Sequence, residues 1–179
     1  MAHSALPFQP LQIAVLTVSD TRDESTDTSG GYLVEALQET GHHLAEKTIV
    51  KDDVYQMRAV VSQWIANINI QVVLVTGGTG FTDRDSTPEA LTPLFDKAVD
   101  GFGELFRQLS YNEISTSTIQ SRAIAGLANS TVIFCMPGST GACKTAWQQI
   151  IKSQLDASHK PCNFVPHLNL AANACETRG

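Results

Sequence analysis

The chain has 179 residues, of which 42% are hydrophobic and 17% are charged. This composition excludes a disordered chain, and the length predicts one domain with a substantial hydrophobic core. The net charge of −6, from 12 basic and 18 acidic residues, excludes a general nucleic-acid binder. No segment has the roughly 20 apolar residues that span a bilayer, so we expect no membrane partner. Without a secretory signal or a C-x-x-C motif, the sequence predicts a cytoplasmic protein with reduced thiols.

The first half of the chain predicts alternating strands and helices. Short β-branched runs and stretches with apolar residues at helical spacing follow one another along it. The expected order is strand 12–18, helix 31–40, strand 44–50, helix 54–67 and strand 71–76. The last of these strands is apolar without interruption, which is typical of a central parallel strand covered on both faces.

The second half predicts a glycine-rich loop, helices and a hairpin. Short helices are expected over 88–95 and 102–113, a hairpin over 122–127 and 131–136, and a helix from about residue 140 to 155. The fold class is therefore α/β, a three-layer α/β/α sandwich whose mostly parallel sheet includes a hairpin. Residues 1–11 are expected to form an N-terminal arm, 12–155 the domain, and 156–179 an extended C-terminal tail.

Four polar loops follow expected strands at their carboxyl ends, where ligands bind in open α/β sheets. They are residues 19–22, 51–53, 76–80 and 137–140. Three glycines within residues 77–80 let backbone N–H groups approach an anion closely. The residues that follow them supply a cation, Arg84, and carboxylates for a hard metal such as Mg²⁺. The pattern favours an anion-binding site, although a tight turn would also explain the glycines.

Asp52 and Asp85 lie just past strand ends and can converge although they are far apart in the sequence. Carboxylates beside a phosphate cradle suggest Mg²⁺-assisted phosphoryl or nucleotidyl transfer. Helix capping explains the same pattern, because Asp52 or Asp53 precedes one expected helix and Asp85 or Thr87 precedes another. The sequence leaves both roles open.

Residues 138–145 come within one residue of the G-x-x-x-x-G-K-[ST] pattern of P-loop NTPases. Cys143 stands where the second glycine belongs, and its Cβ restricts the backbone there. No later apolar strand ends in an aspartate that would complete the metal site. We therefore expect no P-loop, although a helix N-terminus here can hold an anion.

Two adjacent histidines, His42 and His43, fall in an expected helix-to-strand turn, and the sequence offers no third metal ligand near them. We expect both at the surface. Trp64 and Trp147 lie on apolar helix faces and are expected in the core.

A series of motifs runs from residue 12 to residue 167. It comprises L-T-V-S-D at 16–20, D-T-S-G at 27–30, T-G-G-T-G at 76–80, R-D-S-T-P-E-A at 84–90, G-F-G-E at 101–104, S-R-A at 121–123 and M-P-G-S at 136–139. In this order the motifs resemble the MoaB/MogA family of molybdenum cofactor biosynthesis domains. P-L-F-D at 93–96, S-T-S-T at 115–118, C-K-T-A-W at 143–147 and P-C-N-F at 161–164 are most similar to the MoaB branch.

The resemblance implies an α/β/α fold and a homo-oligomer, either a trimer or a hexamer. It implies a reaction in which molybdopterin and ATP give adenylyl-molybdopterin and pyrophosphate, and a separate molybdenum-insertion protein that takes the product. Asp52 and Asp85 match the acidic positions that serve ATP, Mg²⁺ and catalysis in the family. The alternative function is a non-catalytic molybdopterin-binding or assembly protein of the same pathway.

The resemblance also implies substrate-binding positions. Gly77, Gly78, Thr79 and Gly80 would present backbone N–H groups or a hydroxyl to phosphate or pterin. Ser19 and Asp20 would border the site, with Gly138 and Ser139 opposite, and Arg84 is a candidate phosphate partner. The resemblance leaves open which loop takes ATP and which takes the pterin.

Overall fold

A computed structural model describes residues 7–170. In these residues a six-stranded sheet has the order β2-β1-β3-β6-β5-β4. The strands are β1 Gln12–Val18, β2 His43–Val50, β3 Val72–Thr76, β4 Lys97–Ala98, β5 Ile124–Ala128 and β6 Thr131–Met136. β2, β1, β3 and β6 are mutually parallel, whereas β5 and β4 are antiparallel to their neighbours. The predicted α/β class, with a mostly parallel sheet and a hairpin, is confirmed.

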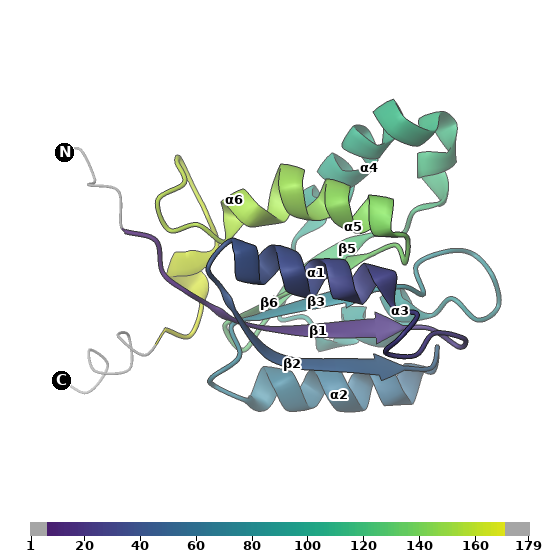
Figure 1. Ribbon diagram of the computed structural model, residues 1–179, viewed down its shortest axis with the longest axis horizontal. Helices are drawn as coiled ribbons and strands as arrows, with labels where there is room; N and C mark the ends of the chain where they lie inside the picture. The colour runs from purple at the N-terminus through teal and green to yellow at the C-terminus, as the bar shows by residue number, and fades with distance from the viewer. Residues whose placement is uncertain (1–6, 171–179) are drawn as a thin grey trace.

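Helices cover both faces of the sheet, and α1, α4 and α5 lie opposite α2 (Figure 1). The helices are α1 Thr28–Glu39, α2 Val54–Ala66, α3 Thr87–Leu91, α4 Asp100–Ile114, α5 Thr140–Ala146 and α6 Lys152–Gln154. Three 3₁₀ turns, η1 Thr92–Leu94, η2 Ser115–Gln120 and η4 Val165–His167, and the π-turn η3 Trp147–Ile151 complete the described elements. No helix within residues 7–170 is long and apolar enough to cross a membrane.

Two hydrophobic cores sandwich the central strands. Leu74 and Phe134 pack with Trp147 on the α1, α4 and α5 side, whereas Val73 packs with Trp64 on the α2 side. Every residue of β3 and β6 is buried. Burying a valine, leucine or isoleucine side chain contributes about 1.5–3 kcal/mol. The continuous apolar runs therefore stabilise strands that have helices on both faces. Both tryptophans lie in the core, as predicted.

The expected hairpin forms through a two-residue turn. Asn129 and Ser130 both have positive φ, at 47° and 60°, and join β5 to β6. Such a turn matches the right-handed twist of the two strands. β4 has only two residues and was not predicted, because so short a strand leaves no sequence pattern.

The start of the first helix is corrected from residue 31 to Thr28. Asp27 caps it by accepting a hydrogen bond from the backbone N–H of Gly30 at 2.9 Å. Gly41 follows its end with φ of 95°, as a helix stop requires.

The expectation that His42 lies at the surface is wrong, because this residue is 2% exposed. Its Nδ1 accepts a hydrogen bond from the backbone N–H of Leu11 at 3.2 Å, and its ring lies 5.0 Å from that of Phe8. Burial lowers the pKa of His42 to about 4. The buried backbone at Leu11 needs an acceptor, and a neutral imidazole supplies one. His43 is exposed, as expected.

Part of the predicted C-terminal tail packs on the domain. The core on the α1, α4 and α5 side of the sheet includes Ala157, Val165 and Leu168. Residues 165–167 form η4, so this part of the tail is not simply extended. Residues 1–6 of the predicted arm and 171–179 of the predicted tail lie outside the described residues. The domain boundaries themselves stay a prediction.

Candidate functional site

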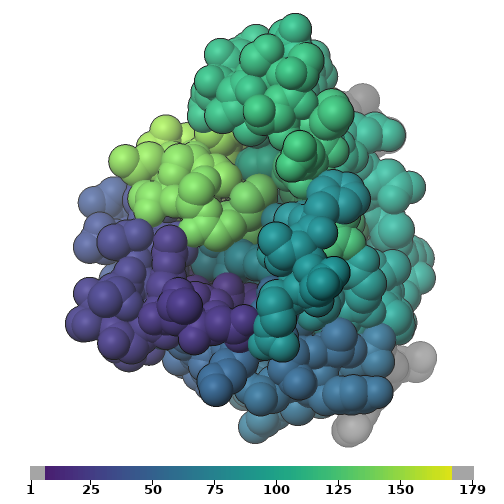
Figure 2. Space-filling model, turned by 90° about the vertical axis from the view of Figure 1, so that its right-hand side faces the viewer, coloured from purple at the N-terminus to yellow at the C-terminus, as the bar shows by residue number. Residues whose placement is uncertain are grey.

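A cavity of about 430 Å³ opens at the carboxyl ends of β1, β3 and β6. Figure 2 views this edge of the sheet and shows a hollow between the segment after β1, the glycine loop, α5 and α4. The lining residues are Thr17, Val18, Ser19, Arg22, Ser29, Thr76, Gly77, Gly78, Thr79, Gly80, Asp85, Ile114, Ser117, Gln120, Ser121, Pro137 and Gly138. Three of the four predicted loops therefore contribute to one cavity.

Glycines that line this cavity let the loops after β1, β3 and β6 approach one another closely. Gly77 has φ of 109°, and a Cβ there would collide with the carbonyl oxygen of Val18. Gly78 has φ of 64°, and its Cβ would lie 2.6 Å from Oδ2 of Asp52. A Cβ at Gly138 would lie 3.3 Å from Cα of Gly77. The glycines thus serve both positive φ and close approach.

Asp52 lies beside the glycine loop and does not cap α2. Asp53 caps α2 by accepting from the N–H groups of Tyr55 and Gln56, both at 2.9 Å. Oδ1 of Asp52 accepts from the N–H of Ser86 at 3.1 Å and from its hydroxyl at 2.7 Å. Oδ2 accepts no hydrogen bond from residues 7–170. Burial raises the pKa of Asp52, the hydrogen bonds from Ser86 oppose that shift in part, and the charge of Asp85 adds to it.

Asp85 approaches the same loop from its other end. Its Oδ2 accepts from the N–H of Thr82 at 2.9 Å and from its hydroxyl at 2.6 Å, and lies 2.8 Å from the place of a Cβ on Gly80. Burial alone would raise the pKa of Asp85, but these hydrogen bonds, together with the backbone of Gly80 and the charge of Arg122, outweigh it and the pKa is lowered. The N-cap of α3 is Ser86, with no side-chain cap bond, so Asp85 and Thr87 do not cap this helix. The two carboxylates therefore flank residues 78–80.

This donor set fits Mg²⁺ better than a metal that needs a full protein cage. No group of three or more His, Cys, Asp or Glu side chains converges within the described part of the chain. Mg²⁺ commonly takes one or two carboxylates together with substrate phosphates and water. Oδ2 of Asp52, free of hydrogen bonds from the described residues, is the kind of hard oxygen ligand such an ion needs.

The remaining predicted residues divide between the cavity and its rim. Ser19 and Gly138 line the cavity. Asp20 and Arg84 are not among its lining residues and instead pair through two hydrogen bonds, Nε–Oδ2 and Nη2–Oδ1, both 2.9 Å. The bond from Arg84 lowers the pKa of Asp20. Ser139 caps α5 through the N–H of Ala142 at 3.1 Å and does not line the cavity.

Several lining residues were not predicted individually. Ser29 and Ser121 lie in the D-T-S-G and S-R-A motifs, which signalled the family without giving them a role. Arg22 is the last residue of the first polar loop and was not singled out. Arg122 fixes the glycine loop from outside the cavity, donating from Nε to the carbonyl of Gly80 at 2.8 Å and from Nη2 to that of Asp85 at 2.9 Å.

Of residues 138–145, which imitate a P-loop, only Gly138 lines the cavity. Nζ of Lys144 stands 5.7 Å from the ring centroid of Tyr32, and Cys143 is fully buried. Neither residue lines the cavity.

Known proteins resemble this chain over most of its length. The family model described as a probable molybdopterin binding domain matches residues 14–157. Molybdenum cofactor biosynthesis protein B of Escherichia coli (strain K12) is 60% identical over 168 residues, covering 94% of this chain and 99% of the relative. The protein of the same name from Bacillus subtilis (strain 168) is 47% identical over 79% of this chain and 84% of its own.

A solved structure agrees with the sequence comparison. A crystal structure of molybdenum cofactor biosynthesis protein B superposes with a TM-score of 0.81 at 44% identity, covering 84% of this chain and 94% of that chain. The family match, the identity and the shared fold span the strands and loops that build the cavity. The chain therefore belongs to the MoaB/MogA family of molybdenum cofactor biosynthesis proteins, in the group of molybdenum cofactor biosynthesis protein B.

Proposed function

We propose that this protein is a Mg²⁺-dependent molybdopterin adenylyltransferase. It would transfer the adenylyl group of ATP to the terminal phosphate of molybdopterin and release pyrophosphate. The observation that carries the proposal is the placement of Asp52, which is not needed as a helix cap and turns one oxygen toward the glycine loop. Asp85 supplies a second carboxylate on the other side of that loop.

The proposed reaction asks little acid–base chemistry of the protein. An oxygen of the molybdopterin phosphate attacks the α-phosphorus of ATP, the bond from that phosphorus to the bridging oxygen breaks, and the electron pair leaves with pyrophosphate. A phosphate monoester is largely ionised at pH 7 and needs no general base. The residues Asp52 and Asp85 would hold Mg²⁺, which when bound neutralises phosphate charge. The glycine loop would position phosphates through its N–H groups.

A single-turnover assay with molybdopterin, ATP and Mg²⁺ tests the proposal by measuring adenylyl-molybdopterin directly. We expect product with the wild-type chain and a loss of about a hundredfold or more with Asp85→Asn. Asp83→Asn is the matched control, because Asp83 is an exposed carboxylate of the same loop that does not line the cavity. A folded wild-type chain that binds molybdopterin but forms no product would support the binding or assembly role instead.

The proposal includes a cytoplasmic homo-oligomer, a trimer or a hexamer, that passes its product to a separate molybdenum-insertion protein. Exposed apolar side chains along α4 and η2 support an interface there, namely Leu105, Tyr111, Ile114 and Ile119, which are 40–74% exposed. Surfaces of this kind often mark protein contacts. Sedimentation velocity on the purified chain should give a trimer or hexamer, and a monomer at micromolar concentration would contradict this part of the proposal.

A further inference from the structure

One cation reaches the cavity from the segment between β1 and α1. Among the described residues that line the cavity, only Arg22 is positively charged. Arg84, the cation predicted to bind phosphate, is already paired with Asp20 on the rim through two hydrogen bonds. Arg22 therefore stands where an anionic group inside the cavity can meet a guanidinium.

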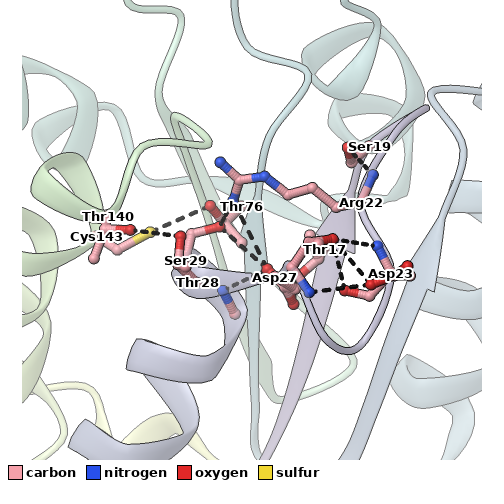
Figure 3. Close-up of polar contacts among 12 residues, drawn as sticks. Thr17, Ser19, Arg22, Asp23, Asp27, Thr28, Ser29, Thr76, Thr140 and Cys143 are labelled. Carbon is pink, nitrogen blue, oxygen red and sulfur yellow. Dashed lines mark hydrogen bonds and ion pairs between the residues drawn. The ribbon is translucent and has the colours of Figure 1, made fainter.

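The conformation of Arg22 is fixed at both ends of the residue. Its backbone N–H donates to the hydroxyl of Ser19 at 3.1 Å, and its Nη1 donates to the hydroxyl of Ser29 at 2.7 Å. Figure 3 shows the side chain extending from its loop toward Ser29 in the first turn of α1. The side chain remains 32% exposed although both ends are held. The side chain of Arg22 is therefore held in one position and still accessible to a ligand.

Arg22 forms no hydrogen bond with Asp27, the acid with which it is paired at longer range. Nη1 lies 3.9 Å from Oδ1 of Asp27, beyond hydrogen-bond distance. The carboxylate of Asp27 already has Lys47 at 3.1 Å, the hydroxyl of Thr17 at 2.8 Å and the N–H of Gly30 at 2.9 Å. Within residues 7–170, neither Nε nor Nη2 of Arg22 donates a hydrogen bond. Two of its three nitrogens are left for a ligand.

We infer that Arg22 is a substrate-binding residue that contacts the terminal phosphate of molybdopterin on the α1 side of the cavity. The inference rests on the proposed function and assigns its two substrates to different sides of the site. A triphosphate with Mg²⁺ suits the side with Asp52 and Asp85, because a divalent ion bridges carboxylate and phosphate oxygens. A monophosphate without a metal suits a guanidinium fork, which offers directed N–H donors. In a protein of net charge −6, such a local cation also offsets the repulsion between protein and substrate.

The test measures binding of molybdopterin and of its dephosphorylated form to the full chain, under anaerobic conditions and without ATP. For Arg22→Gln we expect affinity for molybdopterin to fall about tenfold or more, with affinity for the dephosphorylated form unchanged within about twofold. Arg22→Lys should recover part of the loss, because it keeps the charge but not the fork. Lys152→Gln, which removes an exposed charge that does not line the cavity, should behave like the wild type.

Three results would overturn the inference. Equal weakening of both pterin forms by Arg22→Gln would show a structural role that does not involve the phosphate. If Arg22→Gln weakened the binding of Mg·ATP and left the binding of molybdopterin unchanged, in a parallel titration, Arg22 would be assigned to the nucleotide. Failure of the folded wild-type chain to bind molybdopterin would remove the contact altogether. Binding that depends on Arg22 without any turnover would instead contradict adenylyl transfer alone and leave the contact standing.

Discussion

Two buried aspartates near the cavity, Asp27 and Asp52, differ in how the fold treats their charge. Asp27 receives hydrogen bonds from a backbone N–H and two hydroxyls and forms an ion pair with Lys47. Burial would raise the pKa of Asp27, but these contacts outweigh it and the pKa is lowered. Asp52 accepts hydrogen bonds from one described residue, Ser86, and burial raises its pKa.

The difference separates a structural carboxylate from one kept ready for a ligand. Asp27 ties α1 to β1 and β2, so its charge is compensated within the fold. Asp52 keeps one oxygen without a partner among the described residues, which disfavours its charged form until a cation binds. Sites of this kind commonly cost stability and gain function. Substitution of Asp27 should therefore lower stability, whereas substitution of Asp52 should lower activity and leave stability intact.

Asp27→Asn should produce the largest change in stability. An asparagine can still accept from Gly30, but its amide cannot accept from Thr17 and leaves Lys47 without its buried partner. We expect the free energy of unfolding to fall by about 3 kcal/mol. Urea unfolding followed by circular dichroism measures the change. A loss below about 1 kcal/mol would mean that Asp27 is not the structural carboxylate.

Asp52→Asn should leave stability intact and remove activity. The amide oxygen can still accept from Ser86, and the neutral side chain removes the repulsion with Asp85. We expect single-turnover adenylylation to fall about a hundredfold or more, while the free energy of unfolding stays the same or rises. Normal turnover in the folded variant would refute the proposed role. A large loss of stability would return Asp52 to a structural role.

The pH dependence of stability should distinguish the two aspartates by sign. Because folding lowers the pKa of Asp27, its contribution is present above the ordinary value of 3.8 and is lost as pH falls through the lowered value. Because folding raises the pKa of Asp52, its contribution is present below 3.8 and is lost as pH rises through the raised value. Melting temperatures between pH 3 and 7 should show the deficit of Asp27→Asn shrinking on acidification, whereas Asp52→Asn gains on the wild type as pH rises. Parallel curves would contradict the comparison.

Glu24→Gln should produce the smallest effect and sharpen the comparison with Asp27. Both acids bind Nζ of Lys47, at 2.6 Å for Glu24 and 3.1 Å for Asp27. The side chain of Glu24 is 71% exposed, whereas that of Asp27 is 0% exposed. Solvent screens exposed pairs, so the unfolding free energy should change by less than about 0.5 kcal/mol. A loss comparable to that of Asp27→Asn would mean that burial does not separate the two acids.

The sequence predicted the central fold because its strands carry local signals. β1, β3 and β6 are continuous apolar runs, and their burial on both faces follows from that composition. Asn129 and Ser130 marked the hairpin in the same way. His42 was misplaced because its burial depends on Leu11 and Phe8, which contact it through the tertiary structure and leave no mark at its own position.

The candidate site was predictable as a set of loops but not as a set of contacts. Chain order brought the glycine loop and the loops after β1 and β6 to one edge, as parallel strands require. The choice between Asp52 and Asp53 as the cap of α2 depends on backbone angles that neighbouring identical residues do not reveal. The partners of Asp27, Thr17 and Lys47, come from separate strands, so no local sequence pattern indicates them.

The floor of the cavity limits how this protein can acquire new specificity. At Gly77 and Gly78 any side chain would strike neighbouring atoms, and at Gly138 a Cβ would press on the main chain of Gly77. Saturation mutagenesis should find Gly77 and Gly78 closed to every other amino acid and Gly138 open to few, whereas the lining residues of η2, Ser117 and Gln120, should accept many. Evolution can therefore retune the walls that meet the substrate while the base beneath it stays unchanged.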